Sequence, residues 1–210
     1  MIQIHKGREP RSLTQHRAMP EASYGNCPTS VKDDIRQALL TEQGHLCAYC
    51  QQRIAQDKMK IEHFASQSEF DTQDLQYRNM LGCCLGGEGS PEEKQTCDTR
   101  RGNQPLKYNP ASPPDISTQL RYSGTGELFS NDIEFDQQLN QVLNLNCNQL
   151  KRNRRGVMNK VNTILNSKRG TRTRPELERL LRKWQDKAAE KLEPFNGIAI
   201  YTLQKKLNRL

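Results

Sequence analysis

The chain has 210 residues, a formal net charge of +8 and only 33% hydrophobic residues, with a mean hydropathy of −0.92. No run of about 18 apolar residues occurs, which argues against a membrane-spanning helix, and residues 1–10 lack the apolar stretch of a secretory signal. We therefore expect a cytoplasmic protein whose seven cysteines bind metal or stay free rather than form disulfides.

The basic residues are concentrated towards the C-terminus. Residues 151–210 contain 17 Lys and Arg against 5 Asp and Glu, whereas residues 1–150 carry a net charge of −4. Such a surplus is either the solvated face of a helical region or an electrostatic footprint for a phosphate backbone, and charge alone does not separate the two. Under the second interpretation, Arg152, Arg154 and Arg155 are candidate nucleic-acid contacts.

The first predicted elements are an arm and a helix. Residues 1–28 hold scattered Pro, Gly and Arg without a period, which predicts an extended N-terminal arm. Residues 29–46, TSVKDDIRQALLTEQGHL, have the period of an amphipathic helix; Ser30 and Asp33 have the spacing of a capping box, and Gly44 suits the helix end. The apolar face expected in the core consists of Val31, Ile35, Ala38 and Leu39.

From residue 47 to residue 103 the pattern changes to short elements and turns. Residues 58–64 and 79–84 predict two short strands, and the loop 85–95 between the second strand and the next element is rich in Gly, Pro and Glu. Residues 97–103, CDTRRGN, predict a helix that the following Gly and Pro limit to one or two turns.

The remaining chain is predicted to be a connector followed by helices. In residues 104–135 turns alternate with short extended pieces, and a Gly-Thr-Gly sequence predicts a hairpin. From Asp136 onward the sequence is predicted helical, with Pro175 suited to the first turn of the last candidate helix. The predicted organisation is an arm, a metal-binding core, a connector and a basic helical region, at residues 1–28, 29–105, 106–135 and 136–210.

Several cysteines have the spacing of a structural zinc site, which takes four thiolates in a tetrahedron. The candidates are Cys47, Cys50, Cys97 and either Cys83 or Cys84, of which only one can face the metal if the segment is a strand. The other two cysteines stand alone and are interpreted as small buried hydrophobic residues. Because a closed four-cysteine shell leaves no position for water, any chemistry must come from a second site.

Such a second site is suggested by an adjacent Glu-His pair. Glu62 and Asp98 can supply the hard oxygen ligands that Mg²⁺ prefers. His63 can take a proton from water, and Asn79 can hold the imidazole in orientation.

The segments CAYC, IEHF, YRNMLGCC and TCDTRRGN, in this order, resemble the HNH endonucleases. The pattern in that family is a Cys-x-x-Cys, an acidic residue or His before a His, an Asn with a short apolar run ending in Cys, and a Cys-(His/Asn/Asp)-x-x-Lys. A wider likeness, from about residue 31 onward and including the LNLN and LKRNR segments, is to the PtuB-type HNH proteins of Septu and retron anti-phage systems.

The resemblance implies a role for each matching position. His63 stands at the general base, Asn79 at the Asn that orients it, and Glu62 and Asp98 at the ligands of a catalytic Mg²⁺ or Mn²⁺. Asn103 is the alternative ligand if Asp98 caps the helix.

Two further positions follow from the same resemblance. Cys84 keeps the family's usual distance from Asn79, which favours it over Cys83 as the third ligand of the structural Zn²⁺. Arg101 replaces the usual Lys and is a further candidate for contact with a phosphate.

The fold implied by the resemblance is α+β: a small ββα-metal core (His-Me finger, HNH) held by the four-cysteine zinc, flanked by an N-terminal helix and the basic C-terminal helices. The implied function is metal-dependent hydrolysis of nucleic-acid phosphodiester bonds, in DNA rather than RNA, by the effector subunit of an anti-phage defence system. The implied partners are a PtuA-type ATPase encoded alongside and, from the retron relatives, a reverse transcriptase–msDNA complex; no membrane is involved. Two alternatives remain open, a non-catalytic zinc-knuckle module that binds nucleic acid and a subunit that docks an ATPase.

Overall fold

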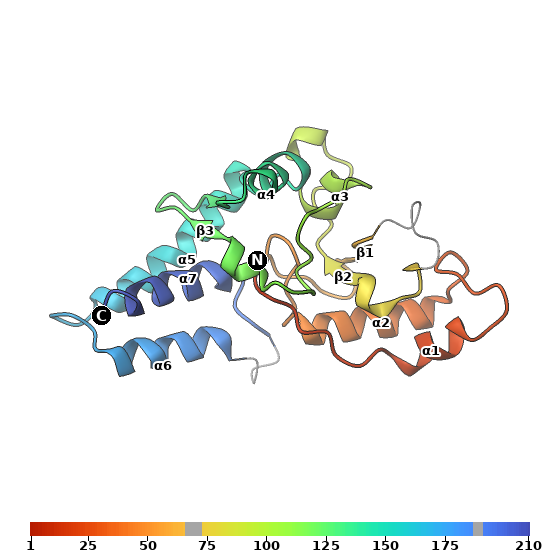
Figure 1. Cartoon of the computed structure of the whole chain (residues 1–210), viewed down its shortest axis with the longest axis horizontal. Coiled ribbons are helices and arrows are strands. Elements are labelled where there is room, and N and C mark those ends of the chain that lie inside the picture. Colours follow the sequence, from red (N-terminus) through yellow and green to blue (C-terminus); the bar gives the residue numbers. More distant parts are fainter. Residues whose placement is uncertain (66–72, 187–190) are drawn as a thin grey trace.

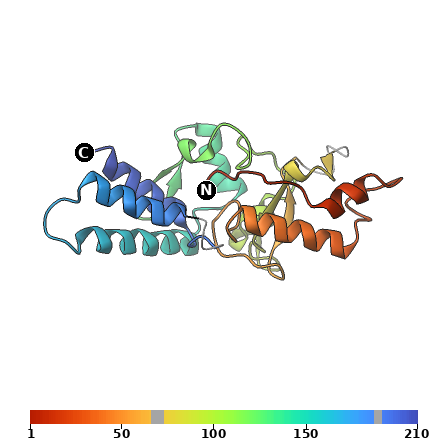
Figure 2. The ribbon, with the colours of Figure 1, turned by 90° about the horizontal axis from the view of Figure 1, so that it is seen from below.

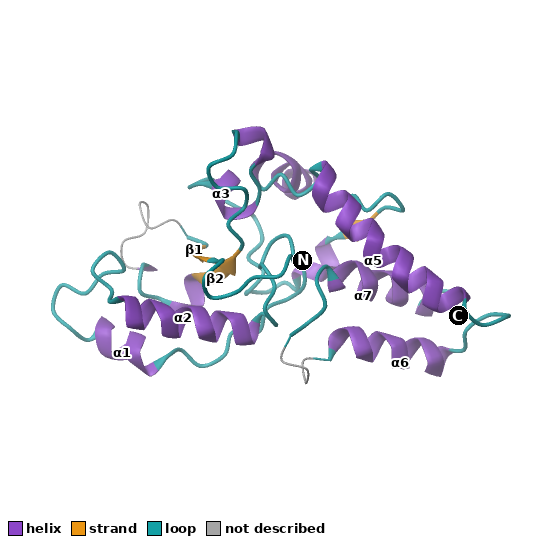
Figure 3. Ribbon diagram, turned by 180° about the vertical axis from the view of Figure 1, so that it is seen from behind, coloured by secondary structure: helices purple, strands orange, loops and turns teal. Residues whose placement is uncertain are grey.

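The computed structural model describes residues 1–65, 73–186 and 191–210 and combines helices with two small antiparallel sheets (Figures 1 and 3). Among the helices in these ranges, none has the length and apolar character needed to cross a bilayer. The helices are α1 Arg11–Arg17, α2 Thr29–Glu42, α3 Cys97–Arg101, α4 Ile133–Gln137, α5 Asn148–Asn166, α6 Arg174–Gln185 and α7 Asn196–Leu207. The strands are β1 Lys60–His63, β2 Met80–Cys83, β3 Arg121–Tyr122 and β4 Leu128–Phe129.

Helix α2 follows the predicted apolar period but not the predicted cap. Its buried side chains include Val31, Ile35 and Leu39, one face of the helix. The predicted capping box is wrong, because the helix begins after Pro28 and no side chain caps its first turn. Gly44 has a φ of +58°, a backbone conformation that favours glycine, and ends the helix as expected.

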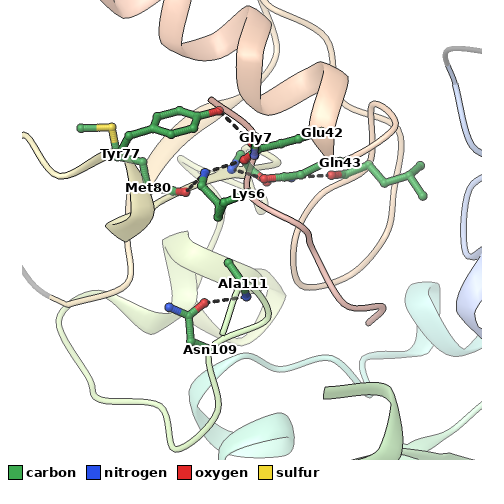
Figure 4. A network of polar contacts seen from close by, with 10 residues as sticks. Lys6, Gly7, Glu42, Gln43, Tyr77, Met80, Asn109 and Ala111 are labelled. Atoms are coloured by element: carbon green, nitrogen blue, oxygen red, sulfur yellow. Dashed lines mark hydrogen bonds and ion pairs between the residues drawn. The ribbon is translucent and has the colours of Figure 1, made fainter. Parts of the chain in front are cut away.

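The N-terminal segment packs on the core instead of extending from it as an arm. The side chain of Lys6 is paired with Glu42 at the end of α2, with Nζ 2.5 Å from Oε1, and donates a second hydrogen bond to the carbonyl of Met80 (Figure 4). The ammonium also lies over the Tyr77 ring, 3.8 Å from its centroid. A buried ammonium with a carboxylate, a carbonyl and an aromatic face around it ties this segment to β2. Met1, Ile4 and Leu13 are buried with it.

The β1–β2 pair lies beside α2, in the half of the molecule that holds the N-terminal helices (Figure 1). The strands are antiparallel, and Glu62 lies opposite Leu81 while His63 lies opposite Met80. The amide of Gln43, just beyond α2, accepts from the backbone N–H of Gly82 and donates to its carbonyl, at 2.7 and 2.8 Å. This side chain satisfies backbone groups of β2 as a neighbouring strand would, and thereby fixes β2 against α2.

The hairpin predicted around Gly-Thr-Gly is confirmed as the pair β3–β4. The basic C-terminal region, however, is not one separate unit beginning at residue 136. Leu139, Leu143, Leu145 and Leu150 belong to the main core, which also contains the cysteines and β1–β2.

The three C-terminal helices share a small second core at one end of the molecule, opposite α1 and α2 (Figures 1 and 2). Helix α7 returns to the middle of the molecule, where Phe195 donates its backbone N–H to the carbonyl of Gln51 and Asn196 accepts from the Gln51 side chain. The second core contains Val161, Leu165, Leu177, Ala199, Leu203 and Leu207. Pro175 lies in the first turn of α6, as predicted.

Candidate metal centre and catalytic residues

Four buried cysteines meet at one point of the main core. The Sγ atoms of Cys47, Cys50, Cys84 and Cys97 all lie within 4.8 Å of one another. The Cys47–Cys97 and Cys50–Cys84 pairs are separated by 3.8 and 3.7 Å. A tetrahedral zinc with Zn–S bonds of about 2.3 Å requires Sγ separations of about 3.8 Å, whereas a disulfide requires about 2.05 Å. The donor set and its spacing therefore fit a structural zinc.

Cys83 does not belong to this group. It is the last residue of β2 and is fully buried, whereas the next residue, Cys84, contributes its thiol to the four. Of these two adjacent thiols, only that of Cys84 lies within 4.8 Å of the other three.

A glycine lets the loop between Cys84 and Cys97 close. Gly86 accepts a backbone hydrogen bond from Thr96 at 2.8 Å and has a φ of +55°. A Cβ on Gly86 would lie 2.2 Å from the carbonyl oxygen of Thr96. The absence of a side chain thus brings the two halves of the cysteine cluster together, and places α3 next to β1.

Glu62, on β1, has its carboxylate in the protein interior. It is 5% exposed, and Oε1 accepts hydrogen bonds from Tyr49 Oη at 3.1 Å and from Arg101 Nη1. Burial, together with a hydrogen bond and like charge from Asp98, raises the pKa of Glu62 to about 9, against the opposing charge of Arg101. A divalent cation held by both carboxyl groups would offset the cost of burying the Glu62 charge and its repulsion by Asp98.

Asp98 lies in the first turn of α3 and is half-buried. The residue before the helix is Thr96, so Asp98 does not occupy the capping position that would have made Asn103 the alternative ligand. Its charge acts on the pKa of both Glu62 and His63. Within the described residues, no third His, Cys, Asp or Glu joins Glu62 and Asp98 in a group as tight as the cysteine cluster.

His63 follows Glu62 and is 9% exposed. Its Nε2 lies 2.8 Å from the carbonyl oxygen of Asp74, and its ring is edge-on to Tyr24 with centroids 4.6 Å apart. Since a carbonyl only accepts, Nε2 carries the proton and Nδ1 carries the lone pair of the neutral ring. Burial lowers the pKa of His63 below its ordinary value, while the carbonyl and the charges of Asp74 and Asp98 oppose the shift.

The side chain of Asn79 forms hydrogen bonds with the backbone at two places after β1. Its Oδ1 accepts from the N–H of Ala65 at 2.7 Å, and its Nδ2 donates to the carbonyls of Ala65 and Gln73 at 3.0 and 3.3 Å. Gln73 precedes Asp74, whose carbonyl holds His63. Asn79 thus bonds to the backbone one residue away from the carbonyl that His63 contacts. Residues 66–72, between these contacts, lie outside the described residues.

Arg101 is not placed to contact a nucleic acid, and this corrects the expectation from its position in the sequence. Its side chain is 2% exposed and ion-paired with Glu62. The same guanidinium donates to the carbonyls of Phe64 and Gln104 at 2.6 and 2.7 Å. With its charge and donors engaged inside the protein, it has no face left for a phosphate.

Arg154 requires the same correction. It is 3% exposed and donates to the carbonyls of Gly126 and Leu145, which joins α5 to the β3–β4 hairpin. Arg152 and Arg155, in contrast, lie on the exposed side of α5. Of the predicted nucleic-acid contacts, these two keep an accessible charge.

Tyr49 is the residue that the sequence did not single out. It stands between the first two cysteines and is 1% exposed, with its hydroxyl on Glu62. Its position between the two cysteines of the Cys-x-x-Cys segment was the one feature of the sequence that could have drawn attention to it.

Comparisons with known proteins find similar chains among retron and Septu proteins. No protein-family model matches the chain. The HNH endonuclease-family protein of retron Vc95 of Vibrio cholerae is 31% identical over 86 residues, which is 40% of each chain. That of retron Ec83 of Escherichia coli is 26% identical over 191 residues, 71% of this chain and 72% of the relative. The Septu protein PtuB of Bacillus thuringiensis is 25% identical over 122 residues, 56% of this chain and 44% of the relative.

Similarity to these retron and Septu proteins, at modest identity, supports an assignment of the chain to an HNH endonuclease family of defence systems. The matched segment spans less than half the length of two of the three relatives.

Proposed function

We propose that the chain is a metal-dependent HNH endonuclease, the effector of an anti-phage defence system. One observation carries the proposal: Glu62, whose pKa is raised in part by Asp98, directly precedes His63 on β1, and Asp98 directly follows Cys97, a member of the four-thiol cluster, on α3. Under this proposal, β1, β2 and α3 form the ββα-metal core and the thiols hold a structural Zn²⁺.

In the proposed mechanism His63 is the general base. Its Nδ1 removes a proton from a water whose oxygen attacks the phosphodiester phosphorus, while Nε2 keeps its hydrogen bond to the Asp74 carbonyl. As the new bond forms, the bond between phosphorus and the 3′ oxygen breaks, and the 3′ oxygen leaves and is protonated by solvent, which gives a 5′-phosphate and a 3′-hydroxyl. Asn79 holds the backbone on which that carbonyl lies. The lowered pKa keeps the imidazole neutral, and so able to accept a proton, at neutral pH.

Glu62 and Asp98 are the residues that would hold the Mg²⁺ or Mn²⁺ of the family. The ion, when bound, supplies positive charge that offsets the negative charge developing on the phosphoryl oxygens. Arg101 stays on Glu62 and positions its carboxylate. Because Glu62 and Asp98 are the only carboxylates proposed as ligands among the described residues, water and substrate oxygens would complete the shell, as is usual for Mg²⁺.

The proposal extends to the substrate, partners and place of action. DNA is the proposed substrate, with the exposed Arg152 and Arg155 of α5 as phosphate contacts. The resemblance to PtuB-type and retron proteins supports a PtuA-type ATPase as partner, a reverse transcriptase–msDNA complex where a retron is present, and a cytoplasmic place of action.

The test is cleavage by the zinc-loaded chain, alone and purified with the ATPase encoded beside it. Supercoiled plasmid and total tRNA are incubated with Mg²⁺ or Mn²⁺, with and without a chelator. His63→Ala should lower cleavage by about 10²–10⁴-fold while one zinc per chain is retained. Glu62→Gln should abolish binding of the second metal.

His16→Ala is the matched control. His16 is also buried and also has Nε2 on a backbone carbonyl, that of Ser23 at 3.1 Å, but it lies on α1. The His16→Ala variant should cleave at the wild-type rate. Cleavage by His63→Ala at the wild-type rate would overturn the assignment of His63 as general base. Nucleic-acid binding without metal-dependent cleavage in any preparation would favour the non-catalytic alternative over the nuclease.

A further inference from the structure

Tyr49 connects the thiol cluster to the carboxylate pair. It lies between Cys47 and Cys50, and its hydroxyl donates to Glu62 Oε1 at 3.1 Å. We infer that Tyr49 is a positioning residue, which transmits the geometry of the zinc knuckle to Glu62 and so sets the affinity of the neighbouring site for its divalent cation. The inference rests on the proposed function, because the cation is the one that Glu62 and Asp98 are proposed to hold.

The knuckle is rigidly attached to the strand pair that carries Glu62. The backbone N–H of Ala48 donates to the carbonyl of Gly82 on β2 at 3.0 Å, one residue from the position opposite Glu62. Gln51 closes the turn by donating its N–H to the carbonyl of Cys47 at 3.1 Å. With Tyr49 1% exposed and fixed at both ends of its segment, its hydroxyl has a defined position relative to β1.

The hydroxyl and the guanidinium restrict the same oxygen of Glu62. Tyr49 Oη and Arg101 Nη1 both donate to Oε1, and Arg101 Nη1 also lies 3.4 Å from the Tyr49 oxygen. Neither donor engages Oε2. Two donors on one oxygen fix the rotation of the carboxylate, which leaves its second oxygen in a constant orientation for a cation shared with Asp98.

The two donors affect the affinity for the cation differently. The positive charge of Arg101 attracts the carboxylate but repels a divalent ion nearby. The phenol is neutral, so it orients Glu62 without that repulsion. The hydroxyl is thus suited to holding the carboxylate in the cation-bound state, in the way that partners of metal ligands orient them in metal sites.

Tyr49→Phe removes only the hydroxyl, and the chain offers a matched control in Tyr77→Phe. Tyr77 is also buried and also donates its hydroxyl to a buried carboxylate, Glu42 Oε2 at 2.9 Å, but outside the site (Figure 4). Both variants are prepared with zinc. Zinc content, thermal unfolding and Mn²⁺ binding, followed by electron paramagnetic resonance of the free ion, are measured for each.

The expected result is that Tyr49→Phe keeps one zinc and unfolds within a few degrees of Tyr77→Phe, but binds Mn²⁺ about tenfold more weakly than wild type. Tyr77→Phe should bind Mn²⁺ as wild type does. In cleavage, Tyr49→Phe should need about tenfold more Mn²⁺ for half-maximal rate, with the rate at saturating Mn²⁺ nearly unchanged.

Unchanged Mn²⁺ affinity in Tyr49→Phe, or equal weakening in both variants, would overturn the inference while leaving the nuclease proposal in place. If the wild-type chain binds no Mn²⁺ beyond its zinc, or if Glu62→Gln binds Mn²⁺ as tightly as wild type, the proposed carboxylate site fails and the inference fails with it.

Discussion

Replacing Cys84 or Cys83 by alanine separates a metal ligand from a neighbour of the same chemistry. Both thiols are buried and adjacent in the chain, but only Cys84 lies within the 4.8 Å group of four. We expect Cys84→Ala to lose zinc to a chelator that leaves the zinc of Cys83→Ala in place. Because each variant removes one sulfur from the interior, the loss of packing is similar in the two.

The expected loss of stability follows from the free energy of zinc binding. Structural zinc binds zinc-finger peptides with about 10–16 kcal/mol at pH 7, which is as large as the whole free energy of unfolding of an ordinary protein, about 5–15 kcal/mol. Losing one of four thiolates should therefore unfold the region around the cluster in Cys84→Ala. Cys83→Ala loses packing of one atom, about 0.5–1.5 kcal/mol, or about 1–6 °C in Tm for a chain of this size.

The assay is zinc per chain by elemental analysis after dialysis against the chelator, with thermal unfolding on the same samples. Wild type treated with chelator until it is metal-free serves as the reference for a cluster without zinc, and Cys84→Ala should resemble it. Full zinc retention by Cys84→Ala would refute the assignment of the four ligands, and zinc loss by Cys83→Ala alone would reverse it.

Two further outcomes follow from the site and from α5. Burial lowers the pKa of His63 from its ordinary 6.5. Because the neutral ring is the base, the cleavage rate at saturating metal should fall only as the pH drops through a value below 6.5. A midpoint above pH 7 in the pH–rate profile would contradict this. The double variant Arg152→Ala/Arg155→Ala should bind DNA more weakly and reduce the slope of log K against log salt concentration by about 2. An unchanged slope would remove α5 from the interface. Arg154→Ala should instead lower Tm, because the carbonyls to which Arg154 donates are left buried and unsatisfied.

Much of the local structure could be predicted because it depends on neighbours in the chain. The apolar period of residues 29–42 gives α2, and the β-prone runs around Glu62 and Leu81 give β1 and β2. The Gly-Thr-Gly turn gives the β3–β4 hairpin. The cap of α2 was predicted wrongly because Pro28 occupies the position before the helix.

The packing of residues 1–28 against the core could not be predicted from their composition. Residues 1–28 have no period, since only a few side chains, among them Ile4 and Leu13, are buried. One of the contacts that hold the segment is the Lys6–Glu42 pair, formed with a residue 36 positions away. A sequence pattern contains no information on such a pairing unless the fold that closes the loop is known.

Residue types and their spacing were enough to identify the chemical groups of a possible site: thiols at knuckle spacing, a Glu-His pair, an Asn and a Cys-Asp. Which of these groups meet depended on the tertiary structure. The fold placed the thiol of Cys84, rather than that of Cys83, in the group of four, turned Arg101 and Arg154 into the interior, and brought the Tyr49 hydroxyl to Glu62. The physical reason is that residue type and spacing fix local geometry, whereas burial and direction of a side chain depend on contacts between segments far apart in the chain.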